Sequence, residues 1–158
     1  ESCVILARKN GIPIVINDRL DIAIACDADG VHLGQQDIPV SRARAILGPH
    51  KIIGTSCKTI EQAQRAFQDG ADYIGCGGVY PTTTKKNNLT LGIQGLHVVC
   101  EGSPLPVVAI GGINASNVKE IFATRPPNLC GVAVVSALFD RADVMAEASH
   151  LREVLSTI

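Results

Sequence analysis

A run of hydroxyl side chains followed by lysines is the most chemically distinctive segment of the sequence. Residues 80–86 read Tyr-Pro-Thr-Thr-Thr-Lys-Lys. Hydroxyl groups donate hydrogen bonds to phosphate oxygens, and a lysine supplies a compact positive charge. A solvated polar loop could also hold these residues, but their place at the end of an expected strand favours phosphate binding.

Two later strand ends carry a second phosphate-binding pattern. Residues 110–113 read Ile-Gly-Gly-Ile, and residues 134–137 read Val-Val-Ser-Ala. In barrel proteins, backbone N–H groups and a helix N-terminus after the last two strands often bind phosphate. Gly112 would let the backbone approach the anion, and Ser136 would add a hydroxyl. The glycines could simply turn the chain, but two such ends in succession favour phosphate binding.

Two aspartates, Asp18 and Asp37, follow successive expected strands. The ends of neighbouring parallel strands meet at one edge of a sheet, so we expect the two carboxylates to lie near each other. Mg²⁺ prefers oxygen ligands and commonly shares them with substrate phosphates, which makes a magnesium site the favoured interpretation. Asp18 could instead cap the helix that follows it, and a carboxylate acid–base pair would need no phosphate site.

Histidine and cysteine give weaker signals. His32 lies inside an expected strand, which favours a packed, hydrogen-bonded histidine over a catalytic base, and the other three histidines fall on loops or helix surfaces. None of the six cysteines forms a C-x-x-C pair. Their apolar or helical surroundings favour buried thiols in a reducing compartment over a disulfide framework or a metal site.

The elements that must position these residues alternate along the chain. Short β-branched runs predict strands at residues 12–16, 30–34, 51–56, 73–80, 106–112 and 131–136. Helical periodicity marks most of the segments between them. Thr59 opens one helix with a capping-box pattern, and its predicted apolar face consists of Ile60, Ala63, Ala66 and Phe67. Gly48 and Gly70 stand where helices would end, and a last helix is expected after Asp140.

Strands that alternate with helices imply a parallel sheet with right-handed crossovers. A doubly wound open sheet and a (β/α)8 barrel two units short both fit six strands. Almost every strand ends in polar or glycine residues, which is typical of a barrel, whereas an open sheet concentrates its site at one switch point. No G-x-G-x-x-G follows a strand. The sequence therefore predicts one incomplete TIM-barrel domain over residues 1–158.

Length and composition agree with one domain built on an aliphatic core. The chain has 158 residues, 46% of them hydrophobic and 3% aromatic, so aliphatic side chains must build the core. A formal charge of −1 argues against nucleic acid or an acidic membrane as partner. No apolar run approaches the ~18 residues of a membrane span, and no signal peptide is evident, so we expect a soluble protein.

Taken together, the motifs resemble the thiamine phosphate synthase family nearly from end to end. They are the stretches 16–19 (Ile-Asn-Asp-Arg), 30–35 (Gly-Val-His-Leu-Gly-Gln) with Asp37, 80–86, 108–113 and 131–137. Residues 74–80, 87–88 and 136–140 most resemble the C-terminal synthase domain of plant bifunctional proteins, in which a hydroxymethylpyrimidine phosphate kinase domain lies upstream.

The resemblance also implies what surrounds the chain. Family members have two strands before the first one here, the second of which ends in a Gln-x-Arg-x-Lys motif that grips a diphosphate. We therefore expect an N-terminally truncated barrel that is poorly stable or self-associates as a homo-oligomer. A plant origin implies the plastid stroma, and any other origin the cytoplasm.

The family joins a pyrimidine methyl diphosphate to a thiazole phosphate and releases pyrophosphate, so small-molecule substrates and Mg²⁺ are implied. By resemblance, Asp18 and Asp37 would bind Mg²⁺. Asn17, Ser56 and Lys85 would contact the pyrimidine diphosphate, Lys85 and Ser56 being the catalytic candidates. The thiazole phosphate would be held by Thr82, Thr83, Thr84, Gly112, Val135 and Ser136.

Two other functions remain open. A thiazole tautomerase would have no pyrophosphate to expel, so the presence of both aspartates and Lys85 argues against it. A non-catalytic phosphate-ligand-binding fragment would bind thiazole phosphate without turnover.

Overall fold

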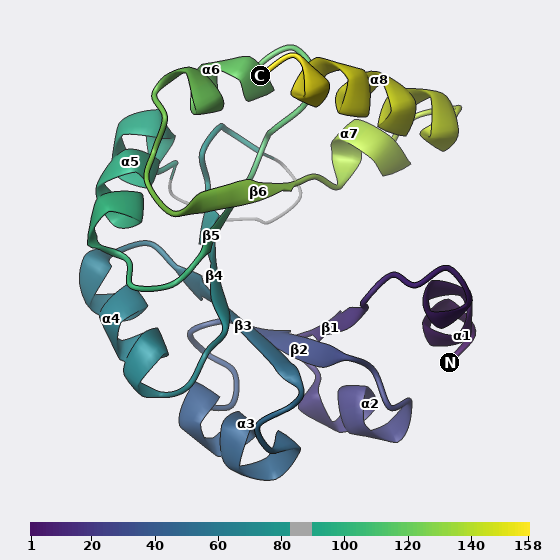
Figure 1. Cartoon of the computed structure of the whole chain (residues 1–158), viewed down its shortest axis with the longest axis vertical. Coiled ribbons are helices and arrows are strands. Elements are labelled where there is room, and N and C mark those ends of the chain that lie inside the picture. Colours follow the sequence, from purple (N-terminus) through teal and green to yellow (C-terminus); the bar gives the residue numbers. More distant parts are fainter. Residues whose placement is uncertain (83–89) are drawn as a thin grey trace.

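The computed structural model describes residues 1–82 and 90–158. It consists of parallel strands that alternate with helices (Figure 1). The strands are β1 (Val15–Asn17), β2 (Gly30–Leu33), β3 (Ile52–Cys57), β4 (Tyr73–Gly77), β5 (Val107–Ile110) and β6 (Leu129–Ala133). The helices are α1 (Ser2–Lys9), α2 (Leu20–Ala25), α3 (Val40–Leu47), α4 (Ile60–Gln68), α5 (Gly92–Gly102), α6 (Val118–Ala123), α7 (Ser136–Phe139) and α8 (Val144–Ser156).

The strands form one sheet in the order β1-β2-β3-β4-β5-β6, and every neighbouring pair is parallel. The sheet curves, and helices α2 to α6 cover its convex side (Figure 1). In the described residues β1 pairs only with β2 and β6 only with β5, so the curved sheet stays open between them. The predicted α/β fold of the TIM-barrel type is confirmed.

The alternation of side chains along each strand divides the molecule into a core and a concave face. One set of alternate residues is fully buried under the helices, as Val31, Ile53 and Ile74 illustrate. The helices contribute alanines and aliphatic residues to this core, among them Ala43 and Ala63. The opposite set, which includes His32 paired with Gly54 and Ser56 paired with Gly75, faces the concave side.

Several strand limits differ from prediction because of local backbone turns. β1 begins at Val15 rather than Ile12, since the Ile12 N–H still bonds to Ala7 O at the end of α1. β4 ends at Gly77 and β5 at Ile110, because Gly78 and Gly111 adopt φ of 83° and 107°.

The last strand runs from Leu129 to Ala133, earlier than predicted. Asn128, at φ 60°, turns the chain directly into it, and its register shifts against β5 between Val107 and Val108. Residues 134–135 then lead into α7 instead of extending the strand.

The predicted helix ends and apolar faces were partly correct. The Thr59 side chain accepts from Gln62 N at 3.3 Å, and Gly48 and Gly70, at φ 75° and 89°, follow α3 and α4 as predicted. Phe67 was wrongly assigned to the apolar face, since it is 55% exposed. The last long helix begins after Asp143, whose side chain accepts from Ala146 N at 3.0 Å, rather than after Asp140.

The cysteines differ in burial, and Cys26 is half-buried. Cys57, Cys76 and Cys100 are buried as predicted, and burial raises the pKa of both Cys57 and Cys76 to about 12. Cys3 and Cys130 are exposed, contrary to the expectation of buried thiols. Within the described residues, no helix is long and apolar enough to cross a membrane.

Candidate active site

A cavity of about 490 Å³ lies on the concave side of the sheet. It runs from the interior of the strands to their carboxyl ends and is mostly apolar. Predicted site residues from separate strand ends contribute to its lining: Asn17, Ser56, Thr82, Gly112, Val135 and Ser136. A cavity of this size and composition matches the usual dimensions of a small-molecule site.

Glycines on the inner face make room for two large side chains. A Cβ on Gly54 would lie 2.1 Å from the Tyr73 ring, and a Cβ on Gly75 would lie 3.0 Å from His32 Cε1. The Tyr73 and His32 rings therefore occupy space that side chains at these two positions would fill. Their ring centroids are 5.5 Å apart, with the planes tilted by 39°.

A hydrogen-bonded chain connects these rings to the cavity. Tyr73 Oη lies 3.0 Å from His32 Nδ1, and His32 Nε2 lies 3.0 Å from Ser56 Oγ. All three residues line the cavity. The expectation of a packed, hydrogen-bonded His32 is confirmed, and burial raises the pKa of the Tyr73 hydroxyl.

The end of β5 comes close to the residues that follow β4. Gly112 has φ 65°, and a Cβ there would lie 2.5 Å from Pro81 O. The carbonyl of Gly112 accepts from Asn117 Nδ2 at 2.9 Å, which fixes the turn before α6. A second hollow of about 540 Å³ shares Thr82, Gly112, Ile113 and Ser136 with the main cavity, so these four residues lie between the two.

The predicted magnesium ligands follow neighbouring strands. Asp18 directly follows β1, at φ 64°, and its N–H donates to His32 O at 2.8 Å. Asp37 follows β2, and its Oδ2 accepts from Gly34 N at 2.6 Å. Asp37 lines a smaller hollow of about 210 Å³ beside α3 and α4 rather than the main cavity.

This donor set suits a cation that takes only part of its coordination shell from protein. The described residues contain no group of three or more His, Cys, Asp or Glu side chains that could hold a metal ion. Mg²⁺ is commonly bound by one or two carboxylates, with water and phosphate oxygens completing the shell. Two aspartates after adjacent strands therefore fit Mg²⁺ and do not fit a metal enclosed by protein ligands.

Thr83, Thr84 and Lys85 lie outside the described residues, whereas Thr82 lines the main cavity.

Two polar side chains of the lining, Lys58 and Tyr73, were not among the predicted site residues. Lys58 carries the one permanent charge among the described lining residues, and Tyr73 supports His32. Lys58 could have been found, because Gly54, Ser56 and Lys58 are alternate residues along β3 and its extension. Tyr73 gave no chemical signal, since its role depends on the register between β3 and β4.

Comparison with known proteins identifies relatives of this arrangement. The thiamine monophosphate synthase family matches residues 1–138. The thiamine-phosphate synthase of Chloroflexus aurantiacus is 43% identical over 96% of this chain and 68% of its own length. A solved structure, the thiamine phosphate pyrophosphorylase from Pyrococcus furiosus, is 39% identical with a TM-score of 0.83, over 96% of this chain and 71% of its own.

Plant proteins are more similar still in sequence. The chloroplastic thiamine biosynthetic bifunctional enzyme of Arabidopsis thaliana is 59% identical over 98% of this chain, which corresponds to 30% of that enzyme. A rice protein of the same description is also 59% identical, and the chain spans 28% of its length. The match to the family covers most of the chain, and the sequence and the fold give the same result. The chain belongs to the thiamine monophosphate synthase family.

Proposed function

We propose that the protein is a thiamine phosphate synthase, which joins 4-amino-2-methyl-5-(diphosphomethyl)pyrimidine to thiazole phosphate and releases pyrophosphate. The observation that carries this proposal is the common cavity. Residues predicted to contact the two substrates come from distant parts of the chain and line the same space of about 490 Å³.

The thiazole phosphate would bind where the two hollows meet. Thr82 and Ser136 offer hydroxyl groups there, and Gly112 lines both hollows, where its backbone can meet the phosphate. Val135 would contribute its backbone beside Ser136, and Thr83 and Thr84 would add further hydroxyls. This phosphate does not react, so its contacts would position the thiazole nitrogen for attack.

The pyrimidine diphosphate would lie toward β1 and β3. Asn17 and Ser56 supply polar groups on that side of the cavity, and Lys85 would meet the departing pyrophosphate. Asp18 and Asp37 would hold Mg²⁺, which when bound neutralises phosphate charge. Lys58 adds a cation to the same lining and is a further candidate for contact with the diphosphate.

The chain would be the synthase part of a larger protein. The plant relatives are bifunctional and chloroplastic by name, which supports a fused kinase domain upstream and a location in the plastid stroma. The open edges of β1 and β6 support closure by further βα units or self-association of the chain.

A coupling assay on the full-length protein tests the proposal. Thiamine phosphate and pyrophosphate should appear in equal amounts when both substrates and Mg²⁺ are present. Asp18→Asn and Asp37→Asn should each raise the Mg²⁺ requirement by at least about tenfold, since even indirect changes around a metal cost that much affinity. Binding of thiazole phosphate without turnover would show a non-catalytic binding protein instead. An unchanged Mg²⁺ titration in both variants would overturn the metal assignment.

A further inference from the structure

We propose that Tyr73 and His32 are positioning residues that fix the Ser56 hydroxyl as a hydrogen-bond donor directed into the cavity. The hydrogen bonds among these three residues are present in this chain whatever reaction it catalyses. The identity of the acceptor, an oxygen or ring nitrogen of the pyrimidine diphosphate, rests on the proposed function.

The three groups form a hydrogen-bonded relay that joins three strands, in the order β4, β2 and β3. Tyr73 begins β4, His32 lies in β2 and Ser56 lies in β3 between them. The two contacts use the opposite ring nitrogens of His32, each at 3.0 Å. Each ring nitrogen of a neutral imidazole has a fixed role, one donating and one accepting. The relay therefore has two possible directions. In one, the Ser56 hydroxyl donates to His32, and in the other it accepts from His32.

The phenol determines which direction is favoured. A phenol is more acidic than an aliphatic hydroxyl, so it is the stronger donor and the weaker acceptor. Partial burial raises the pKa of Tyr73, which keeps its proton in place. With the phenol donating to Nδ1, the imidazole proton must lie on Nε2 and be donated to Ser56 Oγ.

The Ser56 oxygen then accepts from His32, and its own hydrogen must be donated elsewhere. Ser56 lines the cavity, so a substrate acceptor is the partner that this arrangement suits. The backbone of Ser56 is held separately, because its carbonyl accepts from Gln35 Nε2 at 2.6 Å. In this direction His32 cannot remove the serine proton, so Ser56 is a donor to substrate rather than a nucleophile.

The surrounding glycines hold the relay in place. Gly54 and Gly75 lie beside the two rings, and a Cβ at either position would come within 3.0 Å of ring atoms. Side chains locked by packing keep hydrogen-bonding groups in a productive orientation. The orientation of Ser56 thus depends on residues that need not touch the substrate's reacting atoms.

The tautomer of His32 can be measured without any activity. ¹⁵N-histidine-labelled full-length protein should show His32 with a protonated Nε2 and an unprotonated Nδ1 at a pH where the ring is neutral. His32→Gln identifies the signals by their loss, and His50→Gln, on the exposed turn after α3, should leave them in place. Tyr73→Phe should raise the fraction of the Nδ1–H tautomer. A wild-type Nδ1–H tautomer, or a ratio that Tyr73→Phe leaves unchanged, would overturn the proposal even if the protein is an active synthase.

A double-mutant cycle tests the effect on the reaction. Ser56→Ala and His32→Leu should each lower kcat/KM by about tenfold, the value of one hydrogen bond, and the double variant should lose little more. His32→Gln, whose amide can donate to Ser56 from a similar position, should recover most of the loss. Additive losses would mean that His32 does not act through Ser56. Tyr73→Phe provides the same comparison if His32→Leu does not fold.

Discussion

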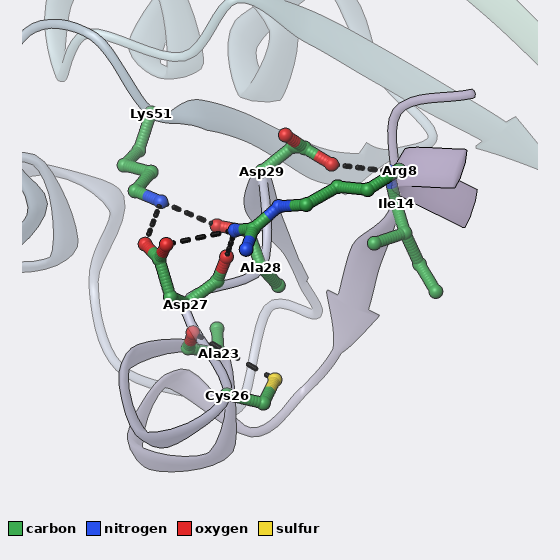
Figure 2. A network of polar contacts seen from close by, with 8 residues as sticks. All are labelled: Arg8, Ile14, Ala23, Cys26, Asp27, Ala28, Asp29 and Lys51. Carbon is green, nitrogen blue, oxygen red and sulfur yellow. Dashed lines mark hydrogen bonds and ion pairs between the residues drawn. The ribbon is translucent and has the colours of Figure 1, made fainter. Parts of the chain in front are cut away.

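The two ends of the strands in this molecule are built from different kinds of residue. At the amino ends, charged side chains pair with one another and with backbone carbonyls (Figure 2). Asp27 accepts from Arg8 at 2.7 Å and from Lys51 at 2.6 Å, and Lys51 also donates to Ala28 O. These contacts join α1 to the segments that lead into β2 and β3.

A second network at the same end is less exposed. The Arg44 guanidinium donates to the carbonyls of Gly48, Lys51 and Gly70 and to Asp72, and Asp72 Oδ2 also accepts from Ile53 N at 2.7 Å. The side chain of Arg44 is 20% exposed. The amino ends thus have their polar groups matched within the fold.

The carboxyl ends carry hydroxyls and glycines around open space instead, and Asp37 lines a further hollow there. This separation is typical of barrels, where residues at the amino ends of strands serve stability and those at the carboxyl ends serve catalysis. Changes at the carboxyl ends should therefore alter activity with little change in stability, and changes at the amino ends should do the reverse.

The largest effect is expected for Lys85→Ala. Its ammonium would meet charge that develops as pyrophosphate departs, so the maximal rate should fall more than binding. By analogy with donors that stabilise developing negative charge, the loss should be about 100- to 1,000-fold. Steady-state kinetics of the full-length protein measure it, with the neighbouring Lys86→Ala as matched control. Equal losses in the two variants would remove the specific role of Lys85.

Arg44→Met should act on stability. It leaves several carbonyls without their side-chain donor and Asp72 without its cationic partner, so the free energy of unfolding should fall by about 2 kcal/mol, while kcat/KM of the folded protein stays unchanged. Urea unfolding measures the change. The control is Arg42→Met on the exposed side of the same helix, which should cost much less. A lower kcat/KM in folded Arg44→Met would contradict the statement that residues at the amino ends of the strands act on stability alone.

The smallest effect is expected for Asp27→Asn. Lys51 and Arg8 hold the pKa of Asp27 below its ordinary value of 3.8, so its ionised form stabilises the folded state. That contribution is present above the unfolded pKa and is lost as pH falls through the lower folded pKa. Wild type should therefore melt slightly higher than Asp27→Asn at neutral pH, and the difference should vanish once the pH falls below the lowered pKa of Asp27. The difference should also shrink in 1 M salt, because the pair is exposed. A difference in melting temperature that persists in acid would show that Asp27 stabilises the fold through something other than its charge.

The sequence predicted features that depend on local residue chemistry. Thr59 and Gly70 delimit α4 through interactions within the helix itself, so their positions along the chain suffice. The clustering of Asn17, Ser56, Gly112 and Ser136 was likewise predictable, because parallel strands bring their carboxyl ends to one edge.

Features that depend on the pairing of distant strands were not predictable. The limits of β6 follow from its register shift against β5, and the relay from Tyr73 to Ser56 follows from the registers of β2, β3 and β4. The lining of a separate hollow by Asp37 depends on how α3 and α4 pack beside β2 and β3.

Direct titration of thiazole phosphate tests the central claim, that the carboxyl ends bind substrate and the amino ends do not. Ser136→Ala in the full-length protein should bind the ligand about 10- to 150-fold more weakly, which is the ~1.5–3 kcal/mol of one hydrogen bond to a charged group. Its thermal midpoint should stay at the wild-type value. Asp27→Asn should bind thiazole phosphate as tightly as wild type does. Wild-type affinity in Ser136→Ala, or weakened binding in Asp27→Asn, would contradict the account.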